Sequence, residues 1–161
     1  MSDDRVSAVF DCMIFLQGLG HRLGPSRRCL ELVDQGRVIL HMSQAIRSEV
    51  TDVLSRPTIL RKFPEIEGTV AQSMLSALWT KVHIYAHPAK SFMLPRDPDD
   101  EPYTDLAIAT AADFLVTWND RHLTYLMRKD TPEGIDFCAR FPHLKIVDPP
   151  TFLRQSDWPS T

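Results

Sequence analysis

Short apolar runs alternate with stretches of helical periodicity along the whole sequence, and this alternation limits the folds that the chain can adopt. Buried strands typically appear as short runs rich in β-branched and aromatic residues. Helices are indicated by apolar positions at helical spacing, bounded by capping residues. We therefore expect strands at residues 6–14, 37–42, 82–86, 113–119 and 144–148, and helices at about 27–35, 44–56, 65–79, 101–112 and 121–129.

Strands that alternate with helices are typical of α/β proteins, in which crossover helices cover a parallel sheet. The predicted fold class is α/β, a three-layer α/β/α arrangement with a mostly parallel central sheet. Glycine and proline are expected to separate its elements. The chain should break at Gly18, Gly20 and Gly24-Pro25, the helix over 44–56 should end at Pro57, and a short turn should follow Pro149-Pro150.

Composition limits the class of protein further. The usual ratio of about one domain per 150 residues predicts that residues 1–161 form a single domain. The net charge of −3 argues against binding nucleic acid through overall positive charge. The 3 widely spaced cysteines indicate reduced thiols in a cytoplasmic protein. No apolar run approaches the roughly 18 residues of a membrane span, and none resembles a signal peptide, so we expect neither export nor membrane insertion.

Acidic residues lie where the predicted strands end or where the helices begin. Asp11 interrupts the first apolar run, where a buried carboxylate needs a partner, although a capping hydrogen bond would also explain it. Glu49 adjoins a core position of its helix, and a surface glutamate is the alternative. Capping of the next helix explains one acid of the 97–100 loop, but not the crowding of Asp97, Asp99 and Asp100.

Two further acids extend this set. Asp105 lies one turn further along the helix that follows the acidic loop, and Asp120 follows the fourth strand beside Asn119. The loops at the carboxyl ends of parallel strands meet at one edge of the sheet, so these residues are expected to share a pocket. Carboxylates without cysteine or histidine favour Mg²⁺ or Mn²⁺. Such a site predicts metal-assisted hydrolysis of phosphodiester bonds.

Several other side chains have two interpretations. Trp118 is placed to stack on a base, and His122 to contact a phosphate, whereas packing or surface roles are the alternative for both. Basic residues could guide an RNA backbone by local attraction, and a solvated helix face is an equally good interpretation. These basic residues are Arg22, Arg27, Arg28, Arg56, Arg61 and Lys62.

Three segments resemble one known family: "VFDCMIFLQGL", "SEVTDVLSRP" and, most specifically, "RDPDDEPYTDLAIATAADFLVTWNDRHL". They are similar to the PIN-domain family, in particular to its VapC-type ribonucleases, the toxins of bacterial toxin-antitoxin pairs. The resemblance covers residues from about 6 to 153. It implies a Mg²⁺- or Mn²⁺-dependent endoribonuclease that acts on RNA, forms a homodimer and is inhibited by a cognate antitoxin protein.

The resemblance also implies roles for individual residues. Asp11 matches the first acid of the family and Glu49 the second. Asp100 matches the third, with Asp105 as a competing choice. The fourth acid falls on Asn119, with Asp120 one position away. We therefore expect Asp11, Glu49, Asp100 and Asp120 as metal ligands, with Asp105 and Asn119 completing the catalytic set.

Two departures from the family pattern leave an alternative open. The opening motif of the family continues as Asp-Thr-Asn, whereas this chain has Asp11-Cys12-Met13 and loses a polar group expected to orient the site. Asn119 removes one negative charge, although an amide oxygen can still bind a cation. The alternative is a degenerate, non-catalytic PIN domain that binds protein or RNA. A DNA nuclease with the same acids is a weaker alternative.

Overall fold

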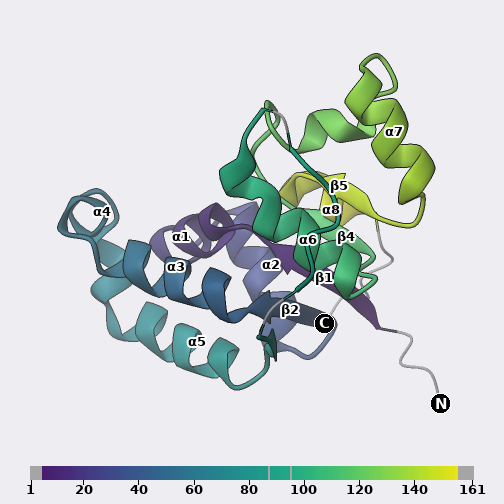
Figure 1. Cartoon of the computed structure of the whole chain (residues 1–161). Helices are drawn as coiled ribbons and strands as arrows, with labels where there is room; N and C mark the ends of the chain where they lie inside the picture. The colour runs from purple at the N-terminus through teal and green to yellow at the C-terminus, as the bar shows by residue number, and fades with distance from the viewer. Residues whose placement is uncertain (1–4, 87, 95, 156–161) are drawn as a thin grey trace.

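The computed structural model describes residues 5–86, 88–94 and 96–155. Within these ranges, a five-stranded sheet lies at the centre, in the order β3-β2-β1-β4-β5 (Figure 1). Every neighbouring pair of strands is parallel, which confirms the predicted α/β class and parallel sheet. The strands are β1 (Val6–Phe10), β2 (Val38–Ser43), β3 (His83–Tyr85), β4 (Phe114–Val116) and β5 (Lys145–Val147).

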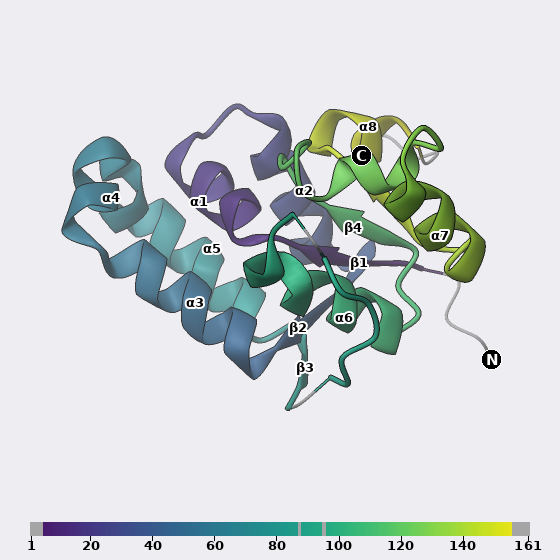
Figure 2. The same cartoon turned by 45° about the horizontal axis from the view of Figure 1, so that its top comes forward.

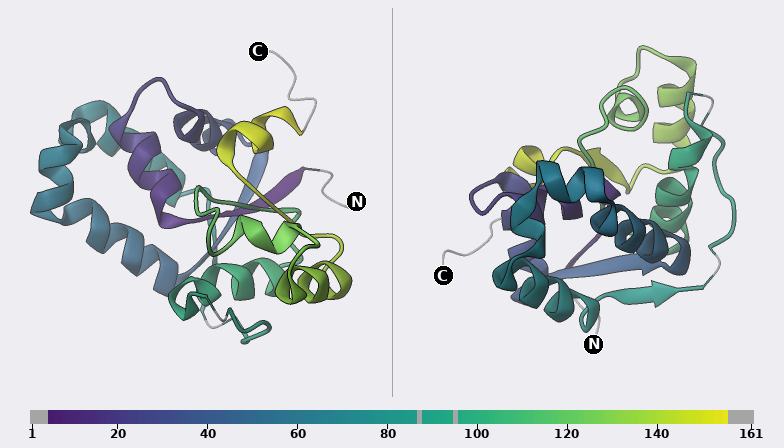
Figure 3. Two further views of the ribbon diagram at one scale, coloured as in Figure 1. Left: turned by 90° about the horizontal axis from the view of Figure 1, so that it is seen from above. Right: turned by 90° about the vertical axis from the view of Figure 1, so that its left-hand side faces the viewer.

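Helices cover both faces of this sheet. Helix α6 lies against β1, β2 and β4 on one face, whereas α2 and α8 lie on the opposite face (Figure 3). Helices α3, α4 and α5 extend the molecule beyond the sheet on the β2 side (Figure 2). The helices are α1 (Cys12–Gly20), α2 (Pro25–Asp34), α3 (Gln44–Ser55), α4 (Pro57–Lys62), α5 (Thr69–Trp79), α6 (Glu101–Ala109), α7 (Pro132–Arg140) and α8 (Pro149–Arg154), with 3₁₀ turns η1 (Pro64–Glu67), η2 (Pro98–Asp100) and η3 (Thr124–Met127).

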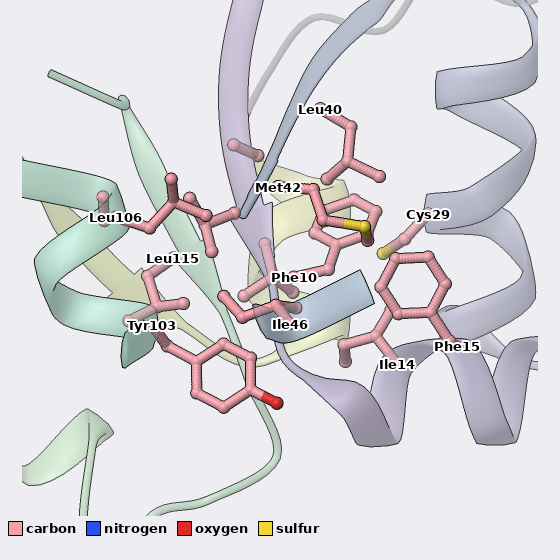
Figure 4. Close-up of a cluster of buried hydrophobic side chains, with 14 of the residues drawn as sticks. Phe10, Ile14, Phe15, Cys29, Leu40, Met42, Ile46, Tyr103, Leu106 and Leu115 are labelled. Atoms are coloured by element: carbon pink, nitrogen blue, oxygen red, sulfur yellow. The ribbon is translucent and has the colours of Figure 1, made fainter. Parts of the chain in front are cut away.

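The core forms around β1, the central strand, and its neighbour β2. Because helices cover both faces, consecutive residues of β1 are buried: Ala8, Val9 and Phe10 are at most 1% exposed. Side chains of α1, α2 and α6 meet around β1 and β2, as the labelled cluster shows (Figure 4). A close-packed frame of this kind fixes the ends of the strands, where polar residues follow.

The first strand is shorter than the sequence predicts. We expected it to run through Ile14, but β1 ends at Phe10 and residues 12–20 form α1. The Asp11 side chain accepts hydrogen bonds from the amides of Met13 and Ile14 and so caps this helix. The periodicity of a short, continuous apolar run does not distinguish a strand from a helix, and this accounts for the error.

Two glycines expected to break the chain lie inside α1 instead. A Cβ on Gly18 would lie 2.5 Å from Cδ1 of Leu30 and 3.1 Å from the carbonyl oxygen of Ser26. A Cβ on Gly20 would lie 2.7 Å from the ring of Phe63. Both glycines therefore allow close packing of α1 on its neighbours, in particular on α2.

Other boundaries also differ from the expectation. Pro57 ends α3 as predicted, but it also begins α4. The predicted helix over 121–129 is a short 3₁₀ turn, and the longer helix of this region is α7, which Thr131 caps. Pro149-Pro150 begins α8, where Asp148 is the capping residue. Proline in a first turn starts a helix as readily as it ends one.

None of the helices within the described ranges is long and apolar enough to cross a membrane.

We predict that Gly18→Ala destabilises the protein, because the added methyl group meets the backbone of α2 as well as Leu30. Overpacking of this kind costs about 1–3 kcal/mol, which urea denaturation can measure. Gly24→Ala is the matched control, since a Cβ there meets nothing within 4 Å. Equal stability losses for the two variants would contradict the packing role of Gly18.

Candidate active site

The order of the strands reverses between β1 and β4, at the centre of the sheet. From β1 the chain builds β2 and β3 on one side, whereas β4 and β5 lie on the other. Ligands of open parallel sheets bind at such a reversal, outside the carboxyl ends of the strands. Asp11 directly follows β1 and Thr117 directly follows β4. The amide of Asp11 also donates to the carbonyl oxygen of Val116, at 3.1 Å.

The carboxylate of Asp11 is buried, and both of its oxygens accept hydrogen bonds. Its Oδ1 accepts from the amides of Met13, at 3.0 Å, and Ile14, at 3.3 Å. Its Oδ2 accepts a hydrogen bond from the Thr117 hydroxyl. Burial raises the pKa of Asp11 to about 6, although these hydrogen bonds oppose the rise, and the charge of Glu49 adds to it. Asp11 is thus a helix cap and also an incompletely compensated charge.

Glu49 is tied to the same place by a tyrosine. It lies on the exposed side of α3, and its Oε2 accepts a hydrogen bond from the hydroxyl of Tyr103, at 3.0 Å. That hydroxyl accepts in turn from the amide of Cys12, at 3.2 Å. Burial, together with the charge of Glu49, raises the pKa of Tyr103 far above its usual range, so the phenol stays protonated. Tyr103 therefore joins the starts of α1 and α6 to the middle of α3.

Asp100 belongs to a second set of hydrogen bonds at the start of α6. Its Oδ2 accepts from Nδ2 of Asn119, at 2.8 Å. Oδ1 of Asn119 accepts from the amide of His122, at 3.1 Å, and Nδ1 of His122 lies 2.9 Å from Oδ2 of Asp97. Within residues 5–86, 88–94 and 96–155, Asp97, Asp100 and His122 form a group whose ligand atoms lie within 4.8 Å of one another. This group has the spacing to hold a cation.

The two sets of acids act on one another. Burial, with the charges of Asp97 and Asp11, raises the pKa of Asp100 to about 6. The charge of Glu49 contributes to the raised pKa of Asp11, so the negative charges of three separate segments share one region. Asp11 and Glu49 are not members of the close group around Asp100. Together these carboxylate oxygens are the donors that Mg²⁺ and Mn²⁺ prefer, and a cation would offset their charge.

Comparison with known proteins identifies the family of the chain. The model of the PIN domain matches residues 7–121, more than half of the chain. The chain belongs to the PIN-domain family. An uncharacterized protein of Methanocaldococcus jannaschii is 22% identical over 155 residues, which cover 96% of this chain and 94% of the relative. The crystal structure of VapBC2 from Rickettsia felis, bound to a DNA fragment from the promoter of these proteins, is similar in fold, with a TM-score of 0.52. The two chains are 18% identical, and the match covers 89% of this chain and 98% of the chain in that structure.

This PIN domain brings together four of the residues that the sequence singled out. Asp11, Glu49, Asp100 and Asn119 lie in the linked hydrogen-bond and charge network described above. They come from the ends of β1 and β4, from α3 and from the start of α6. The expected convergence at the carboxyl edge of the sheet is therefore present for these residues.

Two other predicted site residues make their hydrogen bonds elsewhere in the PIN domain. Oδ1 of Asp105, which is buried, accepts from the amides of Ser91, at 2.8 Å, and Phe92, at 3.4 Å. It thereby holds the loop before α6. Oδ1 of Asp120 accepts from the hydroxyl of Thr124, at 2.6 Å, in an exposed turn. The hydrogen bonds of Asp105 and Asp120 thus give both acids a partner within the fold.

Sequence reasoning missed Thr117 and Tyr103, and it named Asp97 in the crowded acidic loop without including it among the site residues. Thr117 could have been found, since a polar residue at the end of a buried strand is placed to face the site. Tyr103 carries no such signal, because a tyrosine in the first turn of a helix is most simply a core residue.

Of the basic and aromatic residues predicted to contact RNA, two arginines bond within the protein, and Trp118 keeps part of its ring exposed. The Arg27 guanidinium is buried and donates to the carbonyl oxygen of Gly18, at 3.1 Å, so it is structural. Arg56 pairs with Asp52 on an exposed helix face. Trp118 is 37% exposed beside the network, and its Nε1 donates to the hydroxyl of Ser26, at 2.9 Å. A ring that is fixed at one edge and partly open to solvent can stack on a base.

We predict that Asp105→Asn and Asp100→Asn affect Mn²⁺ binding differently. The amide oxygen of an asparagine at 105 still accepts from Ser91 and Phe92, so Mn²⁺ affinity should stay within about twofold of the parent. An asparagine at 100 removes a charged ligand, so the affinity should fall by more than about tenfold. Titration followed by electron paramagnetic resonance measures both. A loss in Asp105→Asn as large as that in Asp100→Asn would make Asp105 the third acid.

Proposed function

We propose that the chain is a divalent-metal-dependent endoribonuclease that hydrolyses RNA phosphodiester bonds, the toxin of a toxin-antitoxin pair. The observation that carries the proposal is the convergence of Asp11, Glu49 and Asp100 at the strand reversal, with the pKa values of Asp11 and Asp100 both raised to about 6. Carboxylates that repel one another in a partly buried place favour a bound cation. Membership of the PIN-domain family supports the same chemistry.

The residues fit a hard cation. Asp11, Glu49 and Asp100 offer carboxylate oxygens, and Asp97 and His122 adjoin Asp100 within 4.8 Å. When bound, Mg²⁺ or Mn²⁺ would polarise a phosphoryl oxygen and lower the pKa of a water molecule. The chain itself fixes the acids: Thr117 holds Asp11, and Asn119 holds Asp100. Asp120, which bonds to Thr124, is the weakest member of the ligand set predicted from the sequence.

The polymer substrate is proposed to be single-stranded or structured RNA. The net charge of −3 leaves phosphate binding to the metal and to local groups. Trp118 lies next to Asn119 and is partly exposed, so an unpaired base has a stacking surface beside the acids. The proposal extends to a cytoplasmic location, a homodimer and a cognate antitoxin protein. The similarity in fold to the VapBC2 structure supports the antitoxin as a partner.

One observation favours the rival function, a non-catalytic PIN domain that binds protein or RNA. Asn119 uses both atoms of its amide, with Nδ2 bonded to Asp100 and Oδ1 to the amide of His122. It therefore supports a neighbouring acid and offers no fourth negative charge to a cation. Incubation of the protein with single-stranded RNA and Mn²⁺, with and without a chelator, separates the two functions. Cleavage that the chelator abolishes supports the enzyme, and RNA binding without cleavage supports the rival.

We predict that Asp11→Asn lowers the rate of RNA cleavage in Mn²⁺ by more than about 100-fold, because the site loses a charged ligand. The fold should survive, since asparagine caps a helix as well as aspartate does. In chelator, the melting temperature should equal or exceed that of the parent, because a buried charge is removed. Thermal unfolding followed by circular dichroism checks this.

Mn²⁺ supplies the complementary measurement. A ligand that binds the folded state at 100 times its dissociation constant stabilises it by about 2.7 kcal/mol. Mn²⁺ should therefore raise the melting temperature of the parent and leave that of Asp11→Asn nearly unchanged. An Asp11→Asn variant that cuts RNA as fast as the parent would overturn the assignment.

A further inference from the structure

Tyr103 has an unusual place for a core aromatic residue. Its ring, 2% exposed, packs with Ile46 and Leu106 in the apolar cluster, while its hydroxyl lies at the edge of that cluster, near the start of α1 (Figure 4). There it bonds to two groups from distant segments. The amide of Cys12 is 91 positions away in the sequence and Glu49 is 54 positions away.

The direction of these two hydrogen bonds is fixed by chemistry. A phenol has one proton to donate, and its oxygen accepts. The backbone amide of Cys12 can only donate, so it occupies the oxygen of Tyr103, at 3.2 Å. The hydroxyl proton is then directed to Oε2 of Glu49, at 3.0 Å. The rigid start of α1, set by the Asp11 cap, therefore aims the proton of Tyr103 at one carboxylate oxygen.

Glu49 has few other restraints. It lies on the exposed side of α3, and a glutamate side chain has several rotatable bonds. The described part of the chain gives its carboxylate one hydrogen bond, the one from Tyr103. Asp11, by contrast, is held by three donors. The acid that comes from a helix surface thus depends on one hydroxyl for its orientation toward the others.

We propose that Tyr103 is a positioning residue that holds Glu49 toward Asp11 in the geometry needed to bind the cation. This inference rests on the proposed function, and it assigns to Tyr103 the orienting role for which residues 12 and 13 offer no suitable side chain. Cys12 contributes its backbone amide, and Met13 is 42% exposed with no polar group in its side chain. Tyr103 acts through Glu49 and does not itself contact the metal or the RNA.

Tyr103→Phe tests this role, because it keeps the ring and removes the hydroxyl. We expect Mn²⁺ affinity, measured by electron paramagnetic resonance, to fall by about tenfold, which is typical of groups that orient a metal ligand. Cleavage should need correspondingly more Mn²⁺ for half-maximal rate, while the rate at saturating Mn²⁺ changes little. Tyr125→Phe is the matched control, since that buried hydroxyl has no hydrogen-bond partner among the described residues. It should leave Mn²⁺ affinity unchanged.

A double-mutant cycle with Glu49→Ala separates positioning from general structure. If Tyr103 acts through Glu49, then adding Tyr103→Phe to the Glu49→Ala variant causes no further loss of Mn²⁺ affinity. A tenfold additional loss in that background, or a Tyr103→Phe variant that binds Mn²⁺ like the parent, overturns the inference and leaves the proposed function intact. A parent protein that neither binds Mn²⁺ nor cuts RNA fails the proposed function itself, and the inference falls with it.

Discussion

The burial of the Asp11 carboxylate at the end of β1 is the constraint on which the arrangement of the site depends. A charge in this position is tolerated because two amides of α1 and the Thr117 hydroxyl bond to it. These contacts fix the angle at which α1 leaves the sheet and tie the end of β1 to the end of β4. Even so, the pKa of Asp11 is raised to about 6. The same residue that organises the local fold therefore leaves a negative charge only partly offset.

From Asp11 the network extends in two directions that differ in rigidity. Toward β4, the Thr117 hydroxyl accepts from the backbone amide of Asn119, and the side chain of Asn119 donates to Asp100 at the start of α6. Toward α3, the network runs through the Tyr103 phenol to Glu49, a long side chain on a helix surface. Asp100 directly precedes α6 and Tyr103 lies in its first turn, so the position of α6 against β1, β2 and β4 sets both branches at once.

Much of this arrangement could be predicted from the sequence, and the failures have physical causes. The end of β2 was predicted to within one residue from a short apolar run, whereas the strand predicted over 113–119 ends at Val116; both runs still locate the edge where the acids gather. Residues 12–14 were assigned to the first strand because a short, continuous apolar run has no periodicity that separates a strand from a helix. The role of Tyr103 could not be foreseen, since its partners lie 91 and 54 positions away and only the folded chain brings them together. Asp105 was selected as a site residue because the sequence does not distinguish a buried carboxylate that accepts from loop amides from one that binds a metal.

Asn119 shows how the charge of such a site can be adjusted without loss of its geometry. Asp100 already faces the charges of Asp97 and Asp11, and these raise its pKa beyond the effect of burial. A fourth carboxylate at position 119 would add another negative charge at the point where Nδ2 now donates to Asp100, at 2.8 Å. The amide replaces that repulsion with a hydrogen bond, and its oxygen fixes the turn through the amide of His122. Asparagine at position 119 therefore limits the negative charge around Asp100 while it holds the Asp100 carboxylate in place.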